Sequence, residues 1–343
     1  MSAILLEGRY TGRLLAYLQE VTTEEKNLGI GEDNKAEKVL GLWWNTTTDH
    51  FTFKMSSRYN HDLLSGRRHP TKREVLRTLM MIFDPLGFIA HFLMYLKVLL
   101  QEIWRSSVDW DTPIEEPQFQ KWLIWLKVLP EVAFVQIPRC YRVSVSPGSS
   151  CNVQMQTFVD ASEYGFAAVV YRRFEEGVVI ETALVSAKTR VVPFLSIPRS
   201  ELQASVLGMR LANSVAQSLS VKMAERYFWT DSRDVLCWLG SDHRRYSQFV
   251  AFRVSEILET TDVRDWRWVP TKQNVADEGT KWTRNPDLSA SSRWYQGPDF
   301  LRRSKAEWPS SPQQGTTEVE LRAHLLVHVS TTETIVNPEN FSK

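Results

Sequence analysis

The stretch FVDASEYGFAAVVYRR, residues 158–173, predicts two strands joined by a tight connection. Apolar runs lie on both sides of Asp160, Ser162 and Glu163, and short polar stretches between such runs are typical of turns. Asp160 stands where the first run is still apolar. It either ends the strand or is held there for chemistry, and this stretch alone leaves both interpretations open.

The composition is that of a folded protein with a substantial core. Of the 343 residues, 43% are hydrophobic and 24% are charged, and this length favours about two domains. The formal net charge is +1, so binding to nucleic acid would depend on local basic patches and not on a global field. The 13 Trp indicate large packed or stacking surfaces.

Targeting signals and a membrane segment are not expected from the sequence pattern. The start, MSAILLEGRYTGRLL, has no basic stretch before a long apolar core, and the most apolar run, residues 86–100, is too short to span a bilayer. The three cysteines form no CxxC pair and no even-numbered framework: Cys140, Cys151 and Cys237. We therefore expect a reduced intracellular setting, cytoplasmic with the nucleus as the alternative, and no membrane partner.

Changes in composition divide the chain into four parts. Residues 1–37 form a polar lead, and residues 38–145 show two short strands followed by three helices. After a Pro-, Gly- and Ser-rich break, residues 153–285 show three strands and then alternating helices and strands. Residues 286–343 are rich in Ser, Pro and Thr and predict a linker. The fold class expected is α/β, a mixed sheet with flanking helices, preceded by a smaller, mainly helical α+β region.

Local signals set the expected element boundaries. Thr71 and Glu74 form a capping box that begins a helix, and Asp84-Pro85 should end it. Ser200 is a candidate N-cap for a helix that runs to about Leu219. The other expected elements are helices at 86–104, 119–129 and near 274–282, and strands at 153–160, 165–172 and 178–187.

Four acidic residues of the second region fall at informative places. Asp160 lies on the first strand, Glu201 opens the long helix, Asp231 ends the strand YFWTD, and Asp277 falls in the first turn of the last helix. Carboxylates brought together in this way suit Mg²⁺, a hard ion that prefers oxygen ligands, and two such ions support phosphoryl transfer. Any one of these residues alone favours capping, whereas the ordered set favours a metal site.

The helix after Glu201 carries small residues at helical spacing: Ala204, Ser205, Gly208 and Ala212. Such a stripe allows the helix to lie close to the sheet. We therefore expect Glu201 to come near Asp160.

The motifs FVDAS, PRSELQA, WTDS and NVADEGTK match, in order, the four acidic motifs of the ribonuclease H domain of retroelement polyproteins. The sequence resembles the Pol polyprotein of BEL/Pao-type LTR retrotransposons, in a region also labelled the Pao retrotransposon peptidase family. KVLGLWWN, TKREVLRTLMMIFDPLGFIAHF and QIPRC resemble the connection between reverse transcriptase and ribonuclease H. WYQGPDFL (294–301) resembles the segment that leads toward the integrase.

The resemblance implies a ribonuclease H-like fold and hydrolysis of the RNA strand of an RNA–DNA hybrid with two Mg²⁺ ions, Mn²⁺ being the alternative. It makes the reverse transcriptase and integrase domains of such a polyprotein further expected partners. It also assigns the catalytic metal ligands: Asp160, Glu201, Asp231 and Asp277.

Several family features are missing from the sequence. No Tyr-x-Asp-Asp polymerase motif occurs, and the integrase core with its zinc-binding His/Cys set is absent. Residues 278–281 read EGTK where the family often has Ser-Arg-Gly, which leaves the structure near Asp277 open. An aspartic peptidase is disfavoured because no Asp-Thr-Gly or Asp-Ser-Gly occurs. The alternative function is a catalytically inactive remnant that binds nucleic acid or a protein partner.

Basic and aromatic residues offer weaker signals. His243 lies in a loop where it could assist product release, although a solvated histidine is the favoured interpretation. Trp229, Trp266 and Trp268 alternate along strands and are expected in the core. Four cations are candidate phosphate contacts, each with a solvated surface charge as the alternative: Lys188, Arg190, Arg244 and Arg245.

Overall fold

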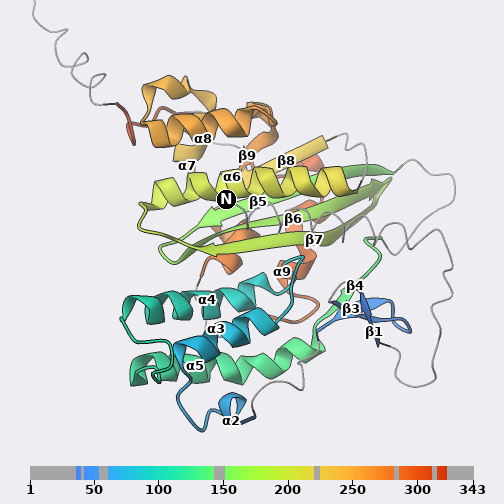
Figure 1. Cartoon of the computed structure of the whole chain (residues 1–343). Helices are drawn as coiled ribbons and strands as arrows, with labels where there is room; N and C mark the ends of the chain where they lie inside the picture. Colours follow the sequence, from blue (N-terminus) through green and yellow to red (C-terminus); the bar gives the residue numbers. More distant parts are fainter. Residues whose placement is uncertain are drawn as a thin grey trace, which may run out of the picture.

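The computed structural model describes residues 36–39, 42–53, 61–142, 151–219, 225–281, 286–310 and 315–322. Nearly all of the polar lead predicted for residues 1–37, and most of the break near residues 145–152, lie outside these ranges. The described chain forms a large sheet, a helix layer above it, and a helical unit with a small sheet below it (Figure 1). Among the described helices, none combines the length and apolarity needed to cross a bilayer.

The large sheet is built around the quoted stretch. Its strands are β5 (Asn152–Ala161), β6 (Gly165–Glu176), β7 (Val179–Val191), β8 (Glu225–Thr230) and β9 (Trp266–Trp268), in the order β7-β6-β5-β8-β9. The three hairpin-connected strands pair antiparallel, whereas β8 and β9 continue the sheet in parallel to β5. The predicted mixed sheet is confirmed, and each of the first three strands is longer than expected.

Three helices cover one side of this sheet: α6 (Ile197–Ser218), α7 (Arg233–Gly240) and α8 (Gln248–Leu258). The small-residue stripe does bring α6 close, because a Cβ added at Gly208 would lie 2.3 Å from Cγ1 of Val159 on β5. The start of α6 differs from the prediction, since Ser196 and not Ser200 is the N-cap. Pro198 is tolerated in the first turn, where its missing N–H has no partner to lose, so the helix begins before it.

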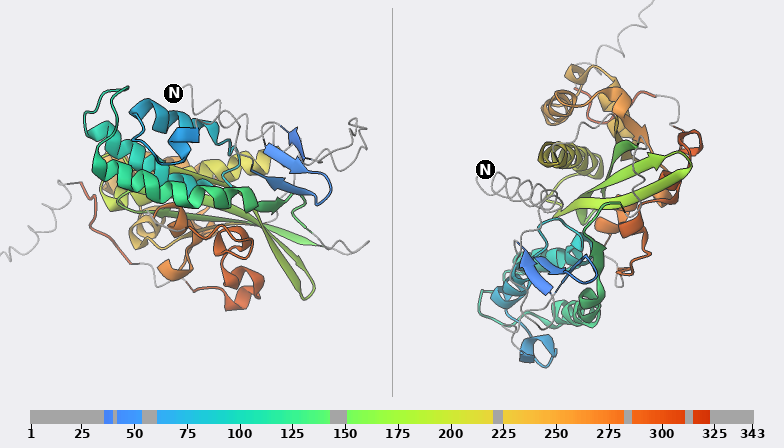
Figure 2. Two further views of the ribbon diagram at one scale, coloured as in Figure 1. Left: turned by 90° about the horizontal axis from the view of Figure 1, so that it is seen from below. Right: turned by 90° about the vertical axis from the view of Figure 1, so that its right-hand side faces the viewer.

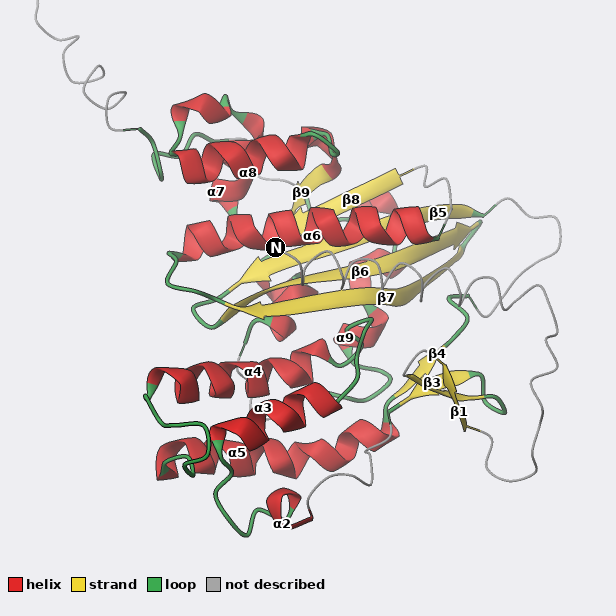
Figure 3. Cartoon of the chain, viewed as in Figure 1, coloured by secondary structure: helices red, strands yellow, loops and turns green. Residues whose placement is uncertain are grey.

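The helical unit below the sheet contains α2 (His61–Leu64), α3 (Lys72–Met81), α4 (Ala90–Arg105) and α5 (Glu116–Val128) (Figure 3). The capping box at the start of α3 is confirmed by reciprocal hydrogen bonds between Thr71 and Glu74. Asp84 follows the end of α3, and its carboxylate accepts the N–H groups of Phe88 and Ile89 at 2.8 and 2.9 Å. One aspartate therefore orders the whole turn into α4.

A four-stranded antiparallel sheet lies beside these helices. It consists of β1 (Ala36–Val39), β2 (Leu42–Asn45), β3 (His50–Thr52) and β4 (Gln136–Pro138), in the order β1-β2-β3-β4. The two strands expected in this part of the sequence are thus present, and β4 joins them from beyond α5.

The helical unit is fastened to β7, the edge strand of the large sheet. The backbone N–H of Ala187 donates to the Leu86 carbonyl at 2.8 Å, and the hydroxyl of Ser186 donates to the same oxygen at 2.9 Å. Farther along, the ammonium of Lys97 on α4 donates to the Thr189 carbonyl at 3.1 Å. Buried residues of the helices and of the sheet form one continuous hydrophobic core.

Residues 286–310, expected to be a linker, pack instead on the face of the sheet opposite α6, including α9 (Arg293–Gln296) (Figure 2). The Tyr171 hydroxyl donates to the Trp294 carbonyl at 2.6 Å, and the buried Arg173 guanidinium donates to the Leu301 carbonyl at 2.7 Å. The indole of Trp294 is fully buried. A few large apolar side chains thus outweigh the polar composition that suggested a linker.

Candidate active site

Asp160 and Asp231 lie side by side at one edge of the large sheet. Asp160 is the penultimate residue of β5, and Asp231 directly follows β8. These strands are parallel neighbours in which Phe158 pairs with Trp229, two residues before each aspartate. The carboxyl ends of parallel strands meet at the same edge, so both residues lie at one edge of the sheet, and their sharing of a metal site stays a prediction.

Glu201 reaches the same edge from α6. Its carboxylate accepts a hydrogen bond from the hydroxyl of Ser232, the residue directly after Asp231. Ser232 also caps α7, because its hydroxyl oxygen accepts the N–H of Val235 at 3.3 Å. One serine therefore fixes the helix after β8 and connects the glutamate of α6 to it.

Asp277 lies in a short 3-10 turn, Val275–Gly279, where the sequence predicted a longer helix near residues 274–282. Thr280 directly follows the turn, and its hydroxyl contacts the Asp277 carbonyl at 3.1 Å and donates to the Asp160 carboxylate at 2.6 Å. The Asp277 carboxylate forms an ion pair with the Lys281 ammonium. The departure EGTK thus supplies two direct contacts to the acidic cluster.

Asn274 connects this turn to the sheet. Its side-chain amide donates to the Val159 carbonyl at 2.9 Å and to the Asp231 carboxylate at 3.2 Å. It is fully buried, and its oxygen accepts the N–H of Ala276 at 3.2 Å. The sequence prediction named the four acids but missed the polar side chains that orient them: Ser232, Asn274, Thr280 and Lys281. All four stand inside the quoted motifs WTDS and NVADEGTK, within four residues of an acid, and that proximity in sequence was the available signal.

The charges of the other three acids all act on Asp160. Burial raises the pKa of Asp160 well above its usual value, the charge of Asp231 adds to this, and Asp277 and Glu201 contribute further. Burial also raises the pKa of Glu201 to about 7, partly opposed by the hydrogen bond from Ser232. The charge of Asp231 therefore disfavours ionisation of both Asp160 and Glu201.

The donor set fits a divalent cation. Within the described part of the chain, no group of three or more Asp, Glu, His or Cys side chains could hold a metal ion as these side chains are placed. Mg²⁺ commonly takes only one or two carboxylates and keeps water or substrate phosphate for its other positions. All side chains of the cluster offer oxygen, and a bound cation would offset the repulsion that raises the pKa values of Asp160 and Glu201.

The raised pKa of Glu201 predicts how stability depends on pH without metal. The folded chain binds this proton more tightly than the unfolded chain, so stability is lost as pH rises from about 4.5 to about 7. We expect Glu201→Gln to reduce that loss by on the order of 1 kcal/mol. Urea unfolding in EDTA at pH 4.5 and pH 7.5 measures the difference. The exposed Glu259→Gln serves as the control, and equal pH dependence in all three proteins would contradict the prediction.

Lys188 and Arg190 lie on β7 near the acidic cluster. They flank Thr189. Thr189 pairs with Ala167 of β6, and Ala167 pairs with Asp160 of β5, so the three residues lie in one row across the sheet. Both cations are partly buried. Their register is compatible with contact to a substrate that lies across the sheet edge, and their role as phosphate contacts stays a prediction.

Arg244 and Arg245 lie farther away, in the 3-10 turn η2 (His243–Arg245) between α7 and α8. Both arginines are exposed, and Asp242 caps the turn by accepting the N–H of Arg244 at 3.0 Å. The histidine expected in a solvated loop is partly buried in the same turn. These residues follow a different helix from the one that carries Glu201.

The tryptophans behave largely as predicted. Trp229 is fully buried and Trp266 is 5% exposed, whereas Trp268 is partly buried. Trp229 stacks on Phe158 with ring centroids 6.0 Å apart. These rings therefore support the strands beneath the acidic cluster and are not free to stack on a base.

Residues 71–232 match the family model described as "Pao retrotransposon-like RNaseH-like domain". No curated protein matches the sequence. Similar solved structures include the N-terminal RNase H domain of Mycobacterium tuberculosis rv2228c (13% identity, 38% of this chain and 91% of that chain, TM-score 0.25). Another is RNase H1 of Halobacterium salinarum (16% identity, 36% and 89%, TM-score 0.24). The match to a foamy viral protease-reverse transcriptase in complex with RNA/DNA hybrid covers 69% of this chain and 29% of that chain, with 10% identity and a TM-score of 0.40.

These structural likenesses are weak, so the function proposed below is supported by the geometry of the cluster and by the family match. The matched range includes three of the four acids and the helices α3 to α6. The fold is α/β, a mixed sheet with flanking helices, and residues 71–232 are similar to the Pao retrotransposon-like RNaseH-like domain family.

Proposed function

We propose that the chain hydrolyses the RNA strand of RNA–DNA hybrids in a reaction that requires Mg²⁺, with Mn²⁺ as the alternative metal. The supporting observation is the convergence of four carboxylates at one sheet edge, where burial and mutual charge raise the pKa values of two of them. Repulsion between such carboxylates lowers the stability of the fold unless a bound cation offsets it, and groups with shifted pKa values of this kind cluster at functional sites. The proposed ligands of two ions are Asp160, Glu201, Asp231 and Asp277.

Bound divalent ions would supply the activation of a water molecule and the stabilisation of the leaving oxygen. The side chains of the protein supply orientation. Thr280 holds one oxygen of Asp160, Asn274 holds one of Asp231, and Ser232 holds one of Glu201. Fixed carboxylates reduce the reorganisation needed when charge develops during the reaction.

Substrate selection would depend on contacts to the ribose and to the phosphates of the nucleic acid. The 2′-hydroxyls of the RNA strand distinguish a hybrid from duplex DNA in the minor groove. Lys188 and Arg190 beside the cluster, and Arg244 and Arg245 farther along, are proposed contacts to phosphates. Reverse transcriptase and integrase domains of a Pol polyprotein are proposed as further partners.

Cleavage of an end-labelled RNA strand in a hybrid tests this proposal. We expect cleavage with Mg²⁺, none with EDTA, and none of a DNA duplex of the same sequence. Asp231→Asn, which keeps the shape of the side chain, should be inactive. Equal cleavage by this variant and the parent would contradict the proposal.

One observation favours the inactive alternative. The Lys281 ammonium is paired with Asp277, and this cation competes for a carboxylate that is proposed to bind metal. A chain that binds a hybrid in EDTA and shows no Mg²⁺-dependent turnover would match a remnant that only binds nucleic acid. Lys281→Met separates a blocked enzyme from a remnant that only binds nucleic acid. Turnover appears in this variant only if the ion pair with Asp277 is what keeps the metal from binding.

A further inference from the structure

Residues 315–322, here called the C-terminal strap, cross the surface formed by α7 and α8. The Trp238 indole N–H donates to the Val319 carbonyl at 3.2 Å, and the Ser247 N–H donates to the Glu320 carbonyl at 2.7 Å. The strap thus runs from the middle of α7 to the start of α8. Eight residues are held in place largely by hydrogen bonds to two other elements.

The carboxylate of Glu320 is bound by donors from two different helices. Arg199 donates from Nε to Oε1 at 2.7 Å and from Nη2 to Oε2 at 2.8 Å, and the Ser247 hydroxyl donates to Oε2 at 2.6 Å. The Arg199 guanidinium also lies over the Phe249 ring, 5.0 Å from its centroid. A guanidinium fork with an added hydroxyl recognises a carboxylate and a phosphate equally well.

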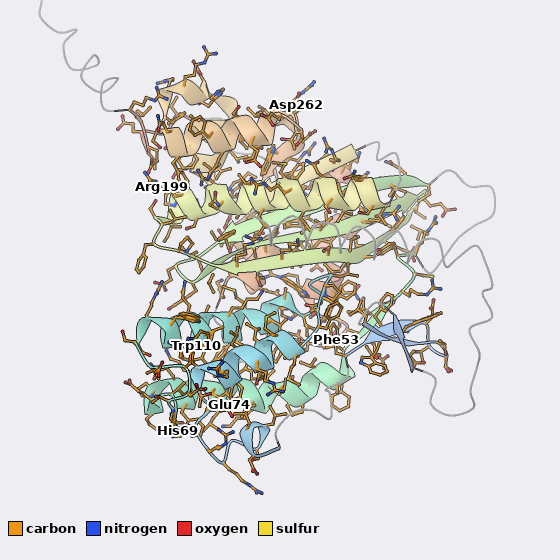
Figure 4. The ribbon with its side chains drawn as sticks, viewed as in Figure 1. Phe53, His69, Glu74, Trp110, Arg199 and Asp262 are labelled. Atoms are coloured by element: carbon orange, nitrogen blue, oxygen red, sulfur yellow. The ribbon has the colours of Figure 1, made fainter. Side chains whose placement is uncertain are left out.

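This anion seat, formed by Arg199 and Ser247, lies next to the acidic cluster. Arg199 precedes Glu201 by two residues at the start of α6, where Figure 4 labels it. The strap touches the margin of the cluster as well, because the Thr317 hydroxyl donates to the Asp234 carboxylate at 2.6 Å. Asp234 lies in the first turn of α7, three residues after Asp231.

We propose that the anion seat binds a backbone phosphate of the nucleic acid and that Glu320 occupies it in its absence, so that the C-terminal strap and the substrate compete. This inference rests on the proposed function for the identity of the ligand. Glu320 of the C-terminal strap would then compete with the substrate from within the same chain. The strap leaves the seat when a phosphodiester enters it.

The conformation of Glu320 is compatible with displacement. Its φ is +64°, in the left-handed region that costs a residue other than glycine about 1–2 kcal/mol. The Arg199–Glu320 pair lies at the surface, where the Arg199 side chain is 37% exposed and salt screens the attraction. The contact is therefore specific in geometry and still open to a competing anion.

Binding of a fluorescent RNA–DNA hybrid to the whole chain in EDTA tests the competition without cleavage. We expect Glu320→Gln to tighten binding about fivefold or more, since it removes the competing charge. Glu318→Gln, two residues away on the exposed side of the strap, controls for the loss of one negative charge. Adding Arg199→Gln to Glu320→Gln should cancel the gain, and the gain should shrink as KCl is raised.

Displacement of the strap can be followed directly at Cys237, whose thiol donates to the Gly315 carbonyl at 3.1 Å. In a chain with Cys140→Ser and Cys151→Ser, this is the remaining thiol of the three in the sequence. We expect hybrid to accelerate its labelling by a neutral maleimide. Glu320→Gln should label fast with or without hybrid. Fast labelling together with tighter hybrid binding identifies a loosened strap, since an unfolded chain labels fast but gains no hybrid affinity.

Two results overturn the inference. If Glu320→Gln binds hybrid no more tightly than Glu318→Gln while the parent binds normally, the strap does not compete, and the proposed function is unaffected. If hybrid leaves the labelling of Cys237 unchanged or slows it, the strap stays in place. Failure of every variant to bind hybrid would overturn the proposed substrate together with this inference.

Discussion

Asp160→Asn is expected to abolish cleavage of an RNA–DNA hybrid and, at the same time, to make the folded chain more stable. Asp160 is 7% exposed, and burial together with the charge of Asp231 raises its pKa. An acid whose pKa is raised in the fold destabilises the fold at any pH where it is ionised. Asparagine removes that charge and can still accept the bond from Thr280, so stability should rise by about 1 kcal/mol or more.

The loss of cleavage should be at least about a hundredfold, because even residues that only support metal ligands have effects of that size. Cleavage with Mg²⁺ and urea unfolding in EDTA at pH 7.5 measure the two effects. Asp109→Asn, an exposed aspartate after α4, should change neither. A variant that is inactive and less stable would show that Asp160 has a structural role, and one that remains active would remove it from the site.

Gly87→Ala is expected to lower the free energy of unfolding by more than about 3 kcal/mol. Gly87 has φ +77°, and an added Cβ would lie 1.8 Å from the carbonyl oxygen of Ala187 on β7. That atom belongs to the backbone of an edge strand and cannot rotate away. The clash would force apart the Leu86–Ala187 hydrogen bond that fastens the helical unit to the sheet.

Gly177→Ala is the matched control for this substitution. Gly177 also has a positive φ, +58°, but an added Cβ would meet nothing within 4 Å. Its cost should be only that of the left-handed backbone, about 1–2 kcal/mol. Urea unfolding of both variants isolates the contribution of the close approach. Equal losses would mean that the helical unit can shift without cost and that this attachment is not rigid.

Much of the large sheet could be predicted from the sequence. The two apolar runs within residues 158–173 predicted the first hairpin, and the small residues near Gly208 predicted the close approach of α6. Both signals are local, since they depend on residues that repeat along one element. The convergence of Asp160 and Asp231 followed from their positions at strand ends, because parallel neighbouring strands end at one edge.

Other features depend on contacts between distant parts of the chain. The packing of Trp294 against the sheet requires the hydroxyl of Tyr171, more than a hundred residues earlier, as its partner. Thr280, the residue after the turn at Asp277, bonds to Asp160 across the fold. Propensity and spacing carry no information about such pairs. The sequence therefore predicted a linker from residue 286 onward and a longer helix near residues 274–282, and the structure differs from both predictions.

The attachment of Leu86 and α4 along β7 has a consequence for how the chain can be divided. An edge strand with open backbone groups is a template for pairing with a second chain, and proteins protect such edges with helices, loops or charges. Here the preceding helices provide that protection. A chain shortened to begin at β5 would keep all four acids and yet present thirteen residues of β7 as an uncovered aggregation surface.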